Sequence, residues 1–421
     1  MNKKQVLIIA FIAVFFISVL ISMYPKSLVI AQPRPPSPLP YYYIKSDGTI
    51  EPSTVPITRV KDEVYMFTGN IIDHTVVVQR DNIVINGAGF SIKQTEEGRK
   101  ITDWAMIAIG CRPGIELINR RNVTVKNLNF EGCMTGIRLI NSSTTIIAKN
   151  NFTYNNVAIT LDDSHNNTII ENNVINNYGY DEDHRVTCNA IIILFGSYNI
   201  ITKNNISMNN GGIFIDFDVC SGRASYSNKI TMNYIASNKN YGIYLSSNYN
   251  ATVVGNIIAN NKYGVMVDYT GYSTFYHNNF INNTIQVYSS TPMGKPNVWD
   301  NGREGNYWSD YNGTDADGDG IGDTSYIIER QTVWIEPTTQ TPITFGVDTE
   351  DRYPLMKPIR IEVSHDEKNQ VTTAEPFPTT WIVAAIAITA MSGATLLIYF
   401  TKSRKQRESQ THGVKEKRRL I

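Results

Sequence analysis

A short acidic loop in the C-terminal third of the chain carries side chains suited to a metal ion. Residues 315–323 read DADGDGIGD, with carboxylates at positions 1, 3, 5 and 9 and a glycine at position 6. Alternating carboxylates can point inward around one hard cation, and this spacing matches the calcium loop, in which position 7 contributes a backbone carbonyl. We therefore predict a structural Ca²⁺ site formed by the carboxylates of Asp315, Asp317, Asp319 and Asp323 and by the carbonyl of Ile321.

The acidic loop departs from the calcium pattern at one place. Position 12 usually holds a bidentate Glu, but Tyr326 stands there in this chain. A further ligand must then come from elsewhere, for example from Asp310. The alternative interpretation is a plain acidic turn that binds no metal.

A second group of carboxylates recurs at one position of an internal repeat. Asp162, Asp216 and Asp268 lie two repeats apart, and Asp218 stands close by in the sequence. In stacked coils ~4.8 Å apart, two repeats separate such carboxylates by roughly 9.6 Å. Inverting glycosidases use ~6.5–9.5 Å. Asp162, Asp216 and Asp218 are therefore catalytic candidates, and the alternative is a solvated acidic face.

Two insertions interrupt the repeat beside these carboxylates. Residues 178–187 add ten residues, and the stretch 216–226 holds about seven more than the regular repeat. Loops that interrupt a regular solenoid commonly shape a binding groove. Aromatic side chains nearby form a possible platform for sugar rings, although scattered surface tyrosines are an equally good interpretation. The predicted groove residues are Asp181, Asp183, His184, Phe214 and Tyr244.

The elements that position these side chains repeat about every 22 residues. Apolar anchors recur with an Asn, or once a Cys, three residues later, and a second apolar strand such as GIRL or GIYL follows each anchor. The segments are short, alternate apolar and polar residues, and are rich in β-branched residues, so strands fit and helices do not. The anchors are Phe130, Phe152, Val174, Ile206, Ile235, Ile257 and Phe280, and the following residues are Cys133, Asn155, Asn177, Asn209, Asn238, Asn260 and Asn283.

Three short strands per repeat predict an all-β fold, a right-handed parallel β-helix whose coils stack along one axis. The same period explains why 34 of the 165 residues from 119 to 283 are Asn. Stacked amides can hydrogen-bond along the axis, and Asn tolerates the left-handed backbone of tight turns. We therefore interpret the repeated Asn as structural.

Several motifs resemble one known family. The first coil, DNIVINGAGFSI at 81–92, and the recurring Asn-Asn pattern resemble the NosD-like, carbohydrate-binding and sugar-hydrolase class of right-handed β-helices. NVWDNGREGNYWSDY at 297–311, the acidic loop, DRYPL at 351–355 and EPFP at 375–378 resemble its archaeal surface members. The resemblance covers most of 41–400 and implies carbohydrate binding, sugar hydrolysis or, through NosD, copper-related maturation of an exported enzyme.

The two ends of the chain predict its location. An apolar run from Val6 to Met23 follows Lys3 and Lys4, and small residues at 29–31 suit signal cleavage, with an uncleaved anchor as the alternative. Residues 381–400 contain no charge and precede a basic tail, as expected for a transmembrane helix with a cytoplasmic C-terminus. We expect a single-pass membrane protein whose β-helix lies outside the cell.

The expected organisation has seven parts. They are a signal peptide or signal anchor (1–31), a Pro-rich spacer and cap (32–64), the β-helix (65–290), a C-terminal cap with the acidic loop (291–360), a linker (361–380), the transmembrane helix (381–400) and the basic tail (401–421).

Four cysteines lie on the side assigned to the oxidising exterior. Cys111 and Cys133 are one repeat apart, so they should stack about 4.8 Å apart, within the ~4.4–6.8 Å Cα window of a disulfide. Cys188 and Cys220 stand at the two insertions and pair by elimination. The alternative is four free thiols.

The charge distribution limits the partners. Residues 32–380 contain 27 Lys/Arg and 36 Asp/Glu, a net charge of −9, which excludes the basic stripe that nucleic acid requires. Copper is disfavoured because His, Met and Cys are dispersed. We expect a membrane-anchored extracellular protein that binds carbohydrate or cell-envelope polymers. The alternatives are a polysaccharide hydrolase or lyase and a NosD-like, copper-related maturation factor.

Overall fold

The computed structural model describes residues 41–95, 113–178, 189–216, 224–290, 296–335 and 342–362. Regular structure within these ranges is entirely β. No helix there is long and apolar enough to cross a membrane. The N-terminal segment, the predicted transmembrane helix at 381–400 and the basic tail lie outside these ranges, so they remain predictions.

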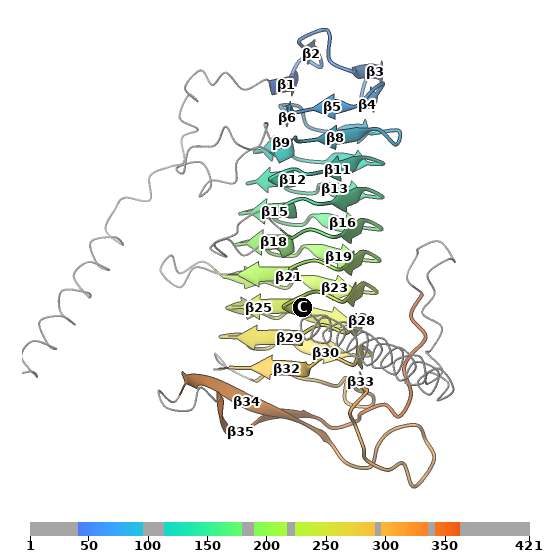
Figure 1. Cartoon of the computed structure of the whole chain (residues 1–421), viewed down its shortest axis with the longest axis vertical. Helices are drawn as coiled ribbons and strands as arrows, with labels where there is room; N and C mark the ends of the chain where they lie inside the picture. Colours follow the sequence, from blue (N-terminus) through green and yellow to red (C-terminus); the bar gives the residue numbers. More distant parts are fainter. Residues whose placement is uncertain are drawn as a thin grey trace, which may run out of the picture. The chain divides into compact units, whose positions relative to one another are not determined.

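The described strands stack into three sheets that run along one axis, as Figure 1 shows. One coil consists of β12 (Thr135–Ile140), then β13 (Ile146–Ala148), then β14 (Asn151–Thr153), and the chain returns to the first sheet as β15 (Val157–Asp162). Each strand pairs in parallel with its counterpart in the next coil. This arrangement confirms the predicted parallel β-helix.

The first sheet, sheet A, has the longest strands. In spatial order it contains β2 (Ile50–Glu51), β1 (Tyr41–Ile44), β6 (Thr75–Val78), β9 (Pro113–Ile118), β12, β15, β18 (Asn189–Leu194), β21 (Gly211–Asp216), β25 (Tyr241–Ser246), β29 (Tyr263–Asp268), β32 (Ile285–Ser289), β34 (Tyr326–Ile335) and β35 (Pro342–Asp351). The pairs β1–β2 and β34–β35 are antiparallel and close its two ends.

Sheets B and C complete each coil. Sheet B contains β3 (Ile57–Lys61), β4 (Val64–Phe67), β7 (Ile83–Asn86), β10 (Val123–Lys126), β13, β16 (Thr168–Ile170), β19 (Ile200–Thr202), β23 (Lys229–Thr231), β27 (Thr252–Val254) and β30 (Thr274–Tyr276). Sheet C contains β5 (Ile71–Ile72), β8 (Ser91–Lys93), β11 (Asn129–Glu131), β14, β17 (Asn173–Ile175), β20 (Asn205–Ser207), β24 (Tyr234–Ala236), β28 (Ile257–Ala259), β31 (Asn279–Ile281) and β33 (Tyr307–Trp308). A short pair, β22 (Ser225–Tyr226) and β26 (Asn248–Tyr249), lies at the turn from sheet A to sheet B.

The interior is filled by several apolar side chains from each coil, such as Ile137, Leu139, Ile147 and Phe152, because residues alternate between core and surface along each strand. The rings of Phe130 and Phe152 stack at 4.8 Å with planes 6° apart. The register shows one error in the sequence alignment: Ile258, not Ile257, pairs with Ile235, and Asn261, not Asn260, follows Asn238 in the ladder. The turn before β25 holds one extra residue, so strand C shifts by 23 residues between these coils while strand A shifts by 22.

Buried Asn side chains satisfy the backbone at the turns. Asn204 is typical: its Nδ2 donates to the backbone carbonyl of Ile169 at 2.9 Å, and its backbone N–H donates to Oδ1 of Asn233 at 3.0 Å. One such ladder follows sheet B and another follows sheet C. Their members are Asn150, Asn172, Asn204, Asn233, Asn256, Asn278 and Asn306, and Asn155, Asn177, Asn209, Asn238, Asn261 and Asn283.

The ladder is structural as predicted, but its Asn residues do not take the left-handed backbone. That conformation falls on the residue before each one except Asn306, such as Lys203 (φ 55°) before Asn204 and Asn176 (φ 58°) before Asn177. The amide is therefore selected for its hydrogen bonds rather than for its backbone freedom.

Cys133 takes the ladder position that Asn fills in later coils. Its side chain is buried and its backbone N–H donates to Oδ1 of Asn155 at 2.8 Å. The expected partner Cys111, and both Cys188 and Cys220, lie outside the described ranges. The two disulfides therefore remain predictions.

An aromatic cap closes the C-terminal end of the core. Trp308 stacks on Phe280 at 4.2 Å and on Tyr326 at 4.2 Å, and Trp299 stacks on Phe275 at 4.1 Å. Asp351, which is 0% exposed, accepts hydrogen bonds from Trp308 Nε1 at 2.8 Å and from the backbone N–H of Asn306 at 2.7 Å. This carboxylate therefore terminates the sheet B ladder.

We predict that Asn204→Ala lowers stability by about 2–4 kcal/mol, because it leaves a buried N–H and a buried carbonyl without partners. Urea unfolding of the full chain, followed by circular dichroism, measures the effect. The matched control is Asn173→Ala on the outer face of sheet C, where Asn173 accepts one bond from Asn205 and the expected loss is under about 1 kcal/mol. Equal losses in the two variants would contradict a special role for the ladder.

Asp351 predicts a specific pH dependence. Burial raises the pKa of this carboxyl to about 6, and the hydrogen bonds from Asn306, Trp308 and Tyr353 lower it in part. Since the native state holds the proton more tightly than the unfolded chain, this contribution to stability is fully present below the unfolded pKa and is lost as the pH rises through about 6. Relative to Asp351→Asn, the native protein should gain about 1–3 kcal/mol between pH 7 and pH 4. A difference that does not change with pH would disprove the assignment.

Candidate functional site

The outer face of sheet A carries a column of large side chains on consecutive strands. Phe214 of β21 pairs with Tyr244 of β25, Tyr244 with Met266 of β29, and Met266 with Tyr288 of β32. The rings of Phe214 and Tyr244 lie 5.2 Å apart. All four side chains are partly exposed. We call this set the aromatic column.

An acidic column runs beside the aromatic column, two residues further along each strand. The register places Asp162, Leu194 and Asp216 on consecutive strands and then Ser246 and Asp268. Asp162 and Asp216 therefore lie two coils apart, as the sequence predicted, with an aliphatic side chain between them. The third catalytic candidate, Asp218, lies outside the described ranges.

Hydrogen bonds link the two columns at their C-terminal end. The hydroxyl of Tyr244 donates to Oδ2 of Asp268 at 3.5 Å, and the hydroxyl of Ser290 donates to Oδ1 of the same carboxylate. Tyr241, whose ring lies 5.4 Å from that of Tyr244, donates to the side chain of Asn189. The tyrosines are thus held in place by strands from several coils.

The ionisation of these tyrosines is suppressed. Burial raises the pKa of Tyr244 to about 12, with Asp268 and Asp216 acting in the same direction. Burial likewise raises the pKa of Tyr241 and of Tyr288. The hydroxyls therefore stay protonated at neutral pH and can each donate one hydrogen bond, while the adjacent carboxylates accept.

The structure brings together two of the five predicted groove residues, Phe214 and Tyr244. The other three, Asp181, Asp183 and His184, fall in a segment outside the described ranges. Sequence reasoning missed Tyr288, although it stands 22 residues after Met266. Extending the repeat by one further coil would have found it.

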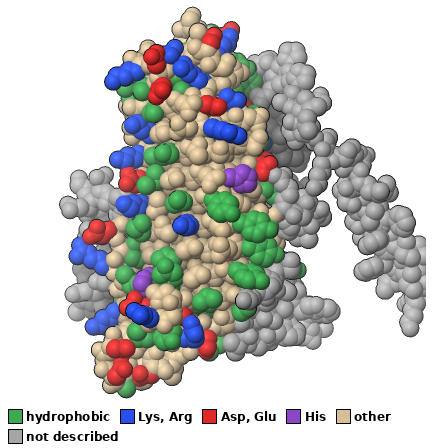
Figure 2. Space-filling view, turned by 180° about the vertical axis from the view of Figure 1, so that it is seen from behind, with side chains coloured by type: hydrophobic (Ala, Val, Ile, Leu, Met, Phe, Trp, Pro, Cys, Tyr) green, Lys and Arg blue, Asp and Glu red, His purple; other side chains and the backbone are tan. Residues whose placement is uncertain are grey.

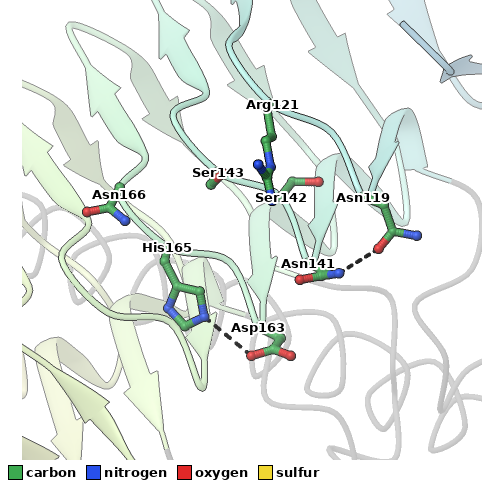
Figure 3. A pocket seen from close by; sticks show the side chains of 8 residues that line it. All are labelled: Asn119, Arg121, Asn141, Ser142, Ser143, Asp163, His165 and Asn166. Atoms are coloured by element: carbon green, nitrogen blue, oxygen red, sulfur yellow. Dashed lines mark hydrogen bonds and ion pairs between the residues drawn. The ribbon is translucent and has the colours of Figure 1, made fainter. Parts of the chain in front are cut away.

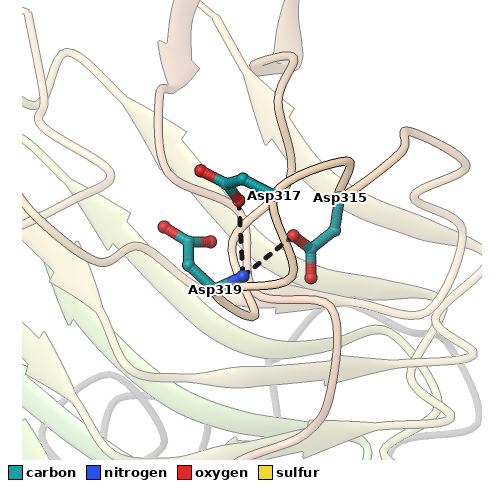
Figure 4. Close-up of side chains that lie close together, drawn as sticks. All are labelled: Asp315, Asp317 and Asp319. Carbon is teal, nitrogen blue, oxygen red and sulfur yellow. Dashed lines mark hydrogen bonds between the residues drawn. The ribbon is translucent and has the colours of Figure 1, made fainter.

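The acidic loop gathers three of its four aspartates. One carboxylate oxygen from each of Asp315, Asp317 and Asp319 lies within 4.8 Å of the others (Figure 4). Asp323 lies outside this group and accepts hydrogen bonds from the backbone N–H of Ala316 at 2.9 Å and from the hydroxyl of Thr314 at 3.1 Å. The three grouped carboxylates also accept backbone hydrogen bonds within the loop, as Asp315 does from Gly318 at 2.8 Å.

Asp310 does not belong to this cluster, because its carboxylate accepts bonds from Tyr326 at 3.2 Å and from Gln286 at 3.1 Å. These bonds join the cap to the last coil, and the suggestion that Asp310 completes the metal site stays a prediction. Ile321, the predicted carbonyl ligand, forms an isolated antiparallel bridge with Leu355.

Comparison with known proteins establishes the family. The family model described as "Right handed beta helix region" matches residues 62–186 and 113–285, which together span more than half of the chain. This chain belongs to that family of right-handed β-helices. No curated protein matches its sequence.

Solved structures with a similar fold include the periplasmic alginate epimerase AlgG, as a double mutant, and a tailspike protein of E. coli bacteriophage HK620, as a double mutant in complex with a pentasaccharide. The epimerase is 16% identical, with 62% of this chain and 80% of that chain covered, at a TM-score of 0.37. The tailspike is 12% identical, with 58% of this chain and 45% of that chain covered, at a TM-score of 0.40. This level of similarity shows the fold alone.

Proposed function

We propose that this protein binds glycans on the outer face of sheet A and is held at the cell surface by the C-terminal segment 381–400. The single observation that carries the proposal is the aromatic column beside the acidic column. Four partly exposed large side chains lie on consecutive coils along one line, and three of them are aromatic. The rings of Phe214 and Tyr244 are adjacent, 5.2 Å apart. The apolar faces of sugar rings pack on such surfaces, because an aromatic ring buries a large area at little conformational cost.

The polar groups around the column suit sugar hydroxyls. A hydroxyl both donates and accepts, and the face offers protonated tyrosine hydroxyls next to the carboxylates of Asp216 and Asp268. The carboxylates also disfavour polyanionic glycans, because like charges repel across a short distance. The preferred ligand is therefore a neutral or amino-sugar polymer of the cell envelope.

A hydrolase or lyase that uses Asp162 and Asp216 is the second candidate. The two carboxylates share one column at a separation of roughly 9.6 Å, two coil spacings. That lies at the upper edge of the ~6.5–9.5 Å range of inverting glycosidases. The aliphatic side chain of Leu194 stands between them, so we place binding ahead of catalysis.

The binding proposal predicts that Phe214→Ala with Tyr244→Ala weakens glycan binding about tenfold or more, because it removes two adjacent aromatic contacts. Binding of the full chain to a panel of neutral, amino-sugar and uronic polysaccharides measures this, with the exposed pair Tyr154→Ala and Tyr178→Ala as the control. The same panel should yield no cleavage products. Turnover that Asp216→Asn abolishes would overturn the ranking of the two candidates.

We also propose that the acidic loop binds Ca²⁺ in a structural role. Three carboxylates within reach of one cation support this, and hard cations prefer oxygen ligands. The loop adjoins the cap, since Gly322 donates its backbone N–H to the carbonyl of Pro354 at 2.8 Å. Bound Ca²⁺ would therefore stabilise the end of the solenoid.

Calorimetric titration of the full chain with Ca²⁺ should show one site, which Asp317→Ala with Asp319→Ala removes. At a Ca²⁺ concentration of 100 Kd, binding should stabilise the native protein by about 2.7 kcal/mol. The control pair is Asp62→Ala with Glu63→Ala, which removes the same charge from an exposed turn far from the loop in the sequence. Binding that survives in the loop variant would refute the site.

A further inference from the structure

A second surface lies on the turn from sheet A to sheet B. In four consecutive coils this turn carries one partly or fully exposed tyrosine, and we call these residues the tyrosine stripe: Tyr198, Tyr226, Tyr249 and Tyr272. Figure 2 shows hydrophobic side chains gathered along one edge of the solenoid and charged side chains along the opposite edge. The stripe is separate from the aromatic column, which lies in the strands of sheet A.

The backbone holds the stripe in line. Tyr226 and Tyr249 pair in parallel between β22 and β26, and their rings stack at 5.6 Å with planes 22° apart. The backbone N–H of Tyr198 donates to the carbonyl of Tyr226 at 2.9 Å, so Tyr198 sits one coil away. Tyr198 and Tyr272 both adopt the left-handed backbone, with φ of 59° and 58°. A bulky aromatic residue is uncommon in that conformation.

The stripe does not stabilise the fold through its polar atoms. Within the described ranges none of the four hydroxyls makes a hydrogen bond. Tyr198 is 58% exposed and Tyr226 46% exposed, so about half of each side chain faces solvent. Large exposed aromatic side chains in a row present apolar area to solvent, and such patches mark interaction sites.

The stripe continues into a polar hollow of ≈ 300 Å³ on the same turn (Figure 3). Bridges connect Arg121 to Ser143 and Ser143 to His165 on consecutive coils, and the backbone N–H of Ser197 in the next coil donates to Nδ1 of His165 at 3.0 Å. Tyr226 follows Ser197, since its N–H donates to Oγ of Ser197 at 3.0 Å. The hollow is lined by Asn119, Arg121, Asn141, Ser142, Ser143, Asp163, His165 and Asn166.

The hollow offers donors and acceptors side by side. The guanidinium of Arg121 makes no ion pair with any described residue. The ring of His165 lies 3.4 Å from the carboxylate of Asp163, and the amide of Asn141 donates to Asn119 at 2.7 Å. A ligand that suits both kinds of group must itself donate and accept, as hydroxyls do.

We propose that this turn is a second glycan-binding surface, on which a linear neutral sugar chain lies along the solenoid axis. Its rings pack on the tyrosine stripe, and the hydroxyls of one end bind in the polar hollow. One ring per coil, at ~4.8 Å, matches a chain of rings laid end to end, and the stripe itself carries no charge that would select a charged polymer. The inference shares only the class of ligand with the proposed function, because the two surfaces have no residue in common.

The test is affinity electrophoresis of the full chain in native gels that contain dissolved neutral polysaccharides (xylan, galactomannan, hydroxyethylcellulose or dextran). Tyr198→Ala with Tyr226→Ala should raise the apparent dissociation constant about tenfold or more. The variant Tyr198→Phe with Tyr226→Phe should retain binding, because the aromatic rings remain and only the hydroxyls are lost. The matched control is Tyr154→Ala with Tyr178→Ala, because these tyrosines are 62% and 48% exposed on another turn and Tyr154 shares the left-handed backbone (φ 58°).

Each outcome decides the proposal. Loss on adding the stripe substitutions to a Phe214→Ala, Tyr244→Ala background, in which the sheet A site cannot contribute, supports it, provided that the Phe variant and the control made in the same background retain binding. No retardation of the native protein by any neutral polysaccharide overturns it, as does equal retardation with and without the stripe substitutions in that background. Retardation by alginate alone, or a dimer in sedimentation that the stripe variant abolishes, would show that the surface serves a charged polymer or a second copy instead.

Discussion

The buried amide ladders are the interaction on which this structure depends. Each coil turns sharply between its sheets, and the N–H and carbonyl groups at those turns cannot reach water. A ladder Asn satisfies both kinds of group. The Oδ1 of Asn172, for example, accepts the backbone N–H of Asn150 in the preceding coil, and its Nδ2 donates to the backbone carbonyl of Ile147. An unpaired buried polar group costs about 1–3 kcal/mol, so losses would accumulate quickly over some seven coils. The Asn excess is therefore a requirement of the fold.

The same ladders explain where insertions are tolerated. Asn177 and Asn209 are 32 residues apart in sequence, yet the N–H of Asn177 still donates to Asn209 at 2.9 Å. In the sequence, the additional residues stand between the ladder residue Asn177 and β18, which is the next strand of sheet A. The ladder is therefore uninterrupted across this insertion, and the strands of the two coils keep their pairing.

Much of this architecture could be predicted from the sequence, since a period is visible wherever one residue type repeats. The coil, the ladder and the shared column of Asp162 and Asp216 all follow from that period. The prediction failed where geometry depends on one extra residue, as at the turn before β25, where Ile257 was assigned to the position of Ile258. The hydrogen bonds of Asp310 with Tyr326 and Gln286 were not predicted either, because they come from segments whose proximity no local pattern reveals. The tyrosine stripe was missed because its members are spaced irregularly, across an insertion, and occupy two different, adjacent turn positions.

In a solenoid, residues at equivalent positions of successive coils form columns on the surface, and the order of these columns around the coil determines which chemical groups lie side by side. Along β29 and the turn that follows, Met266 of the aromatic column is followed by Asp268 of the acidic column and then by Tyr272 of the stripe. The acidic column therefore stands between the two aromatic surfaces in every coil where an Asp occupies it. Carboxylates on this boundary repel polyanions from both sides, while Asp268 remains an acceptor for Tyr244 and Ser290. A neutral chain meets no such barrier on either surface. If glycans bind as we propose, selection of uncharged polymers would follow from the position of a few aspartates between two rows of side chains, and it would require no enclosed pocket.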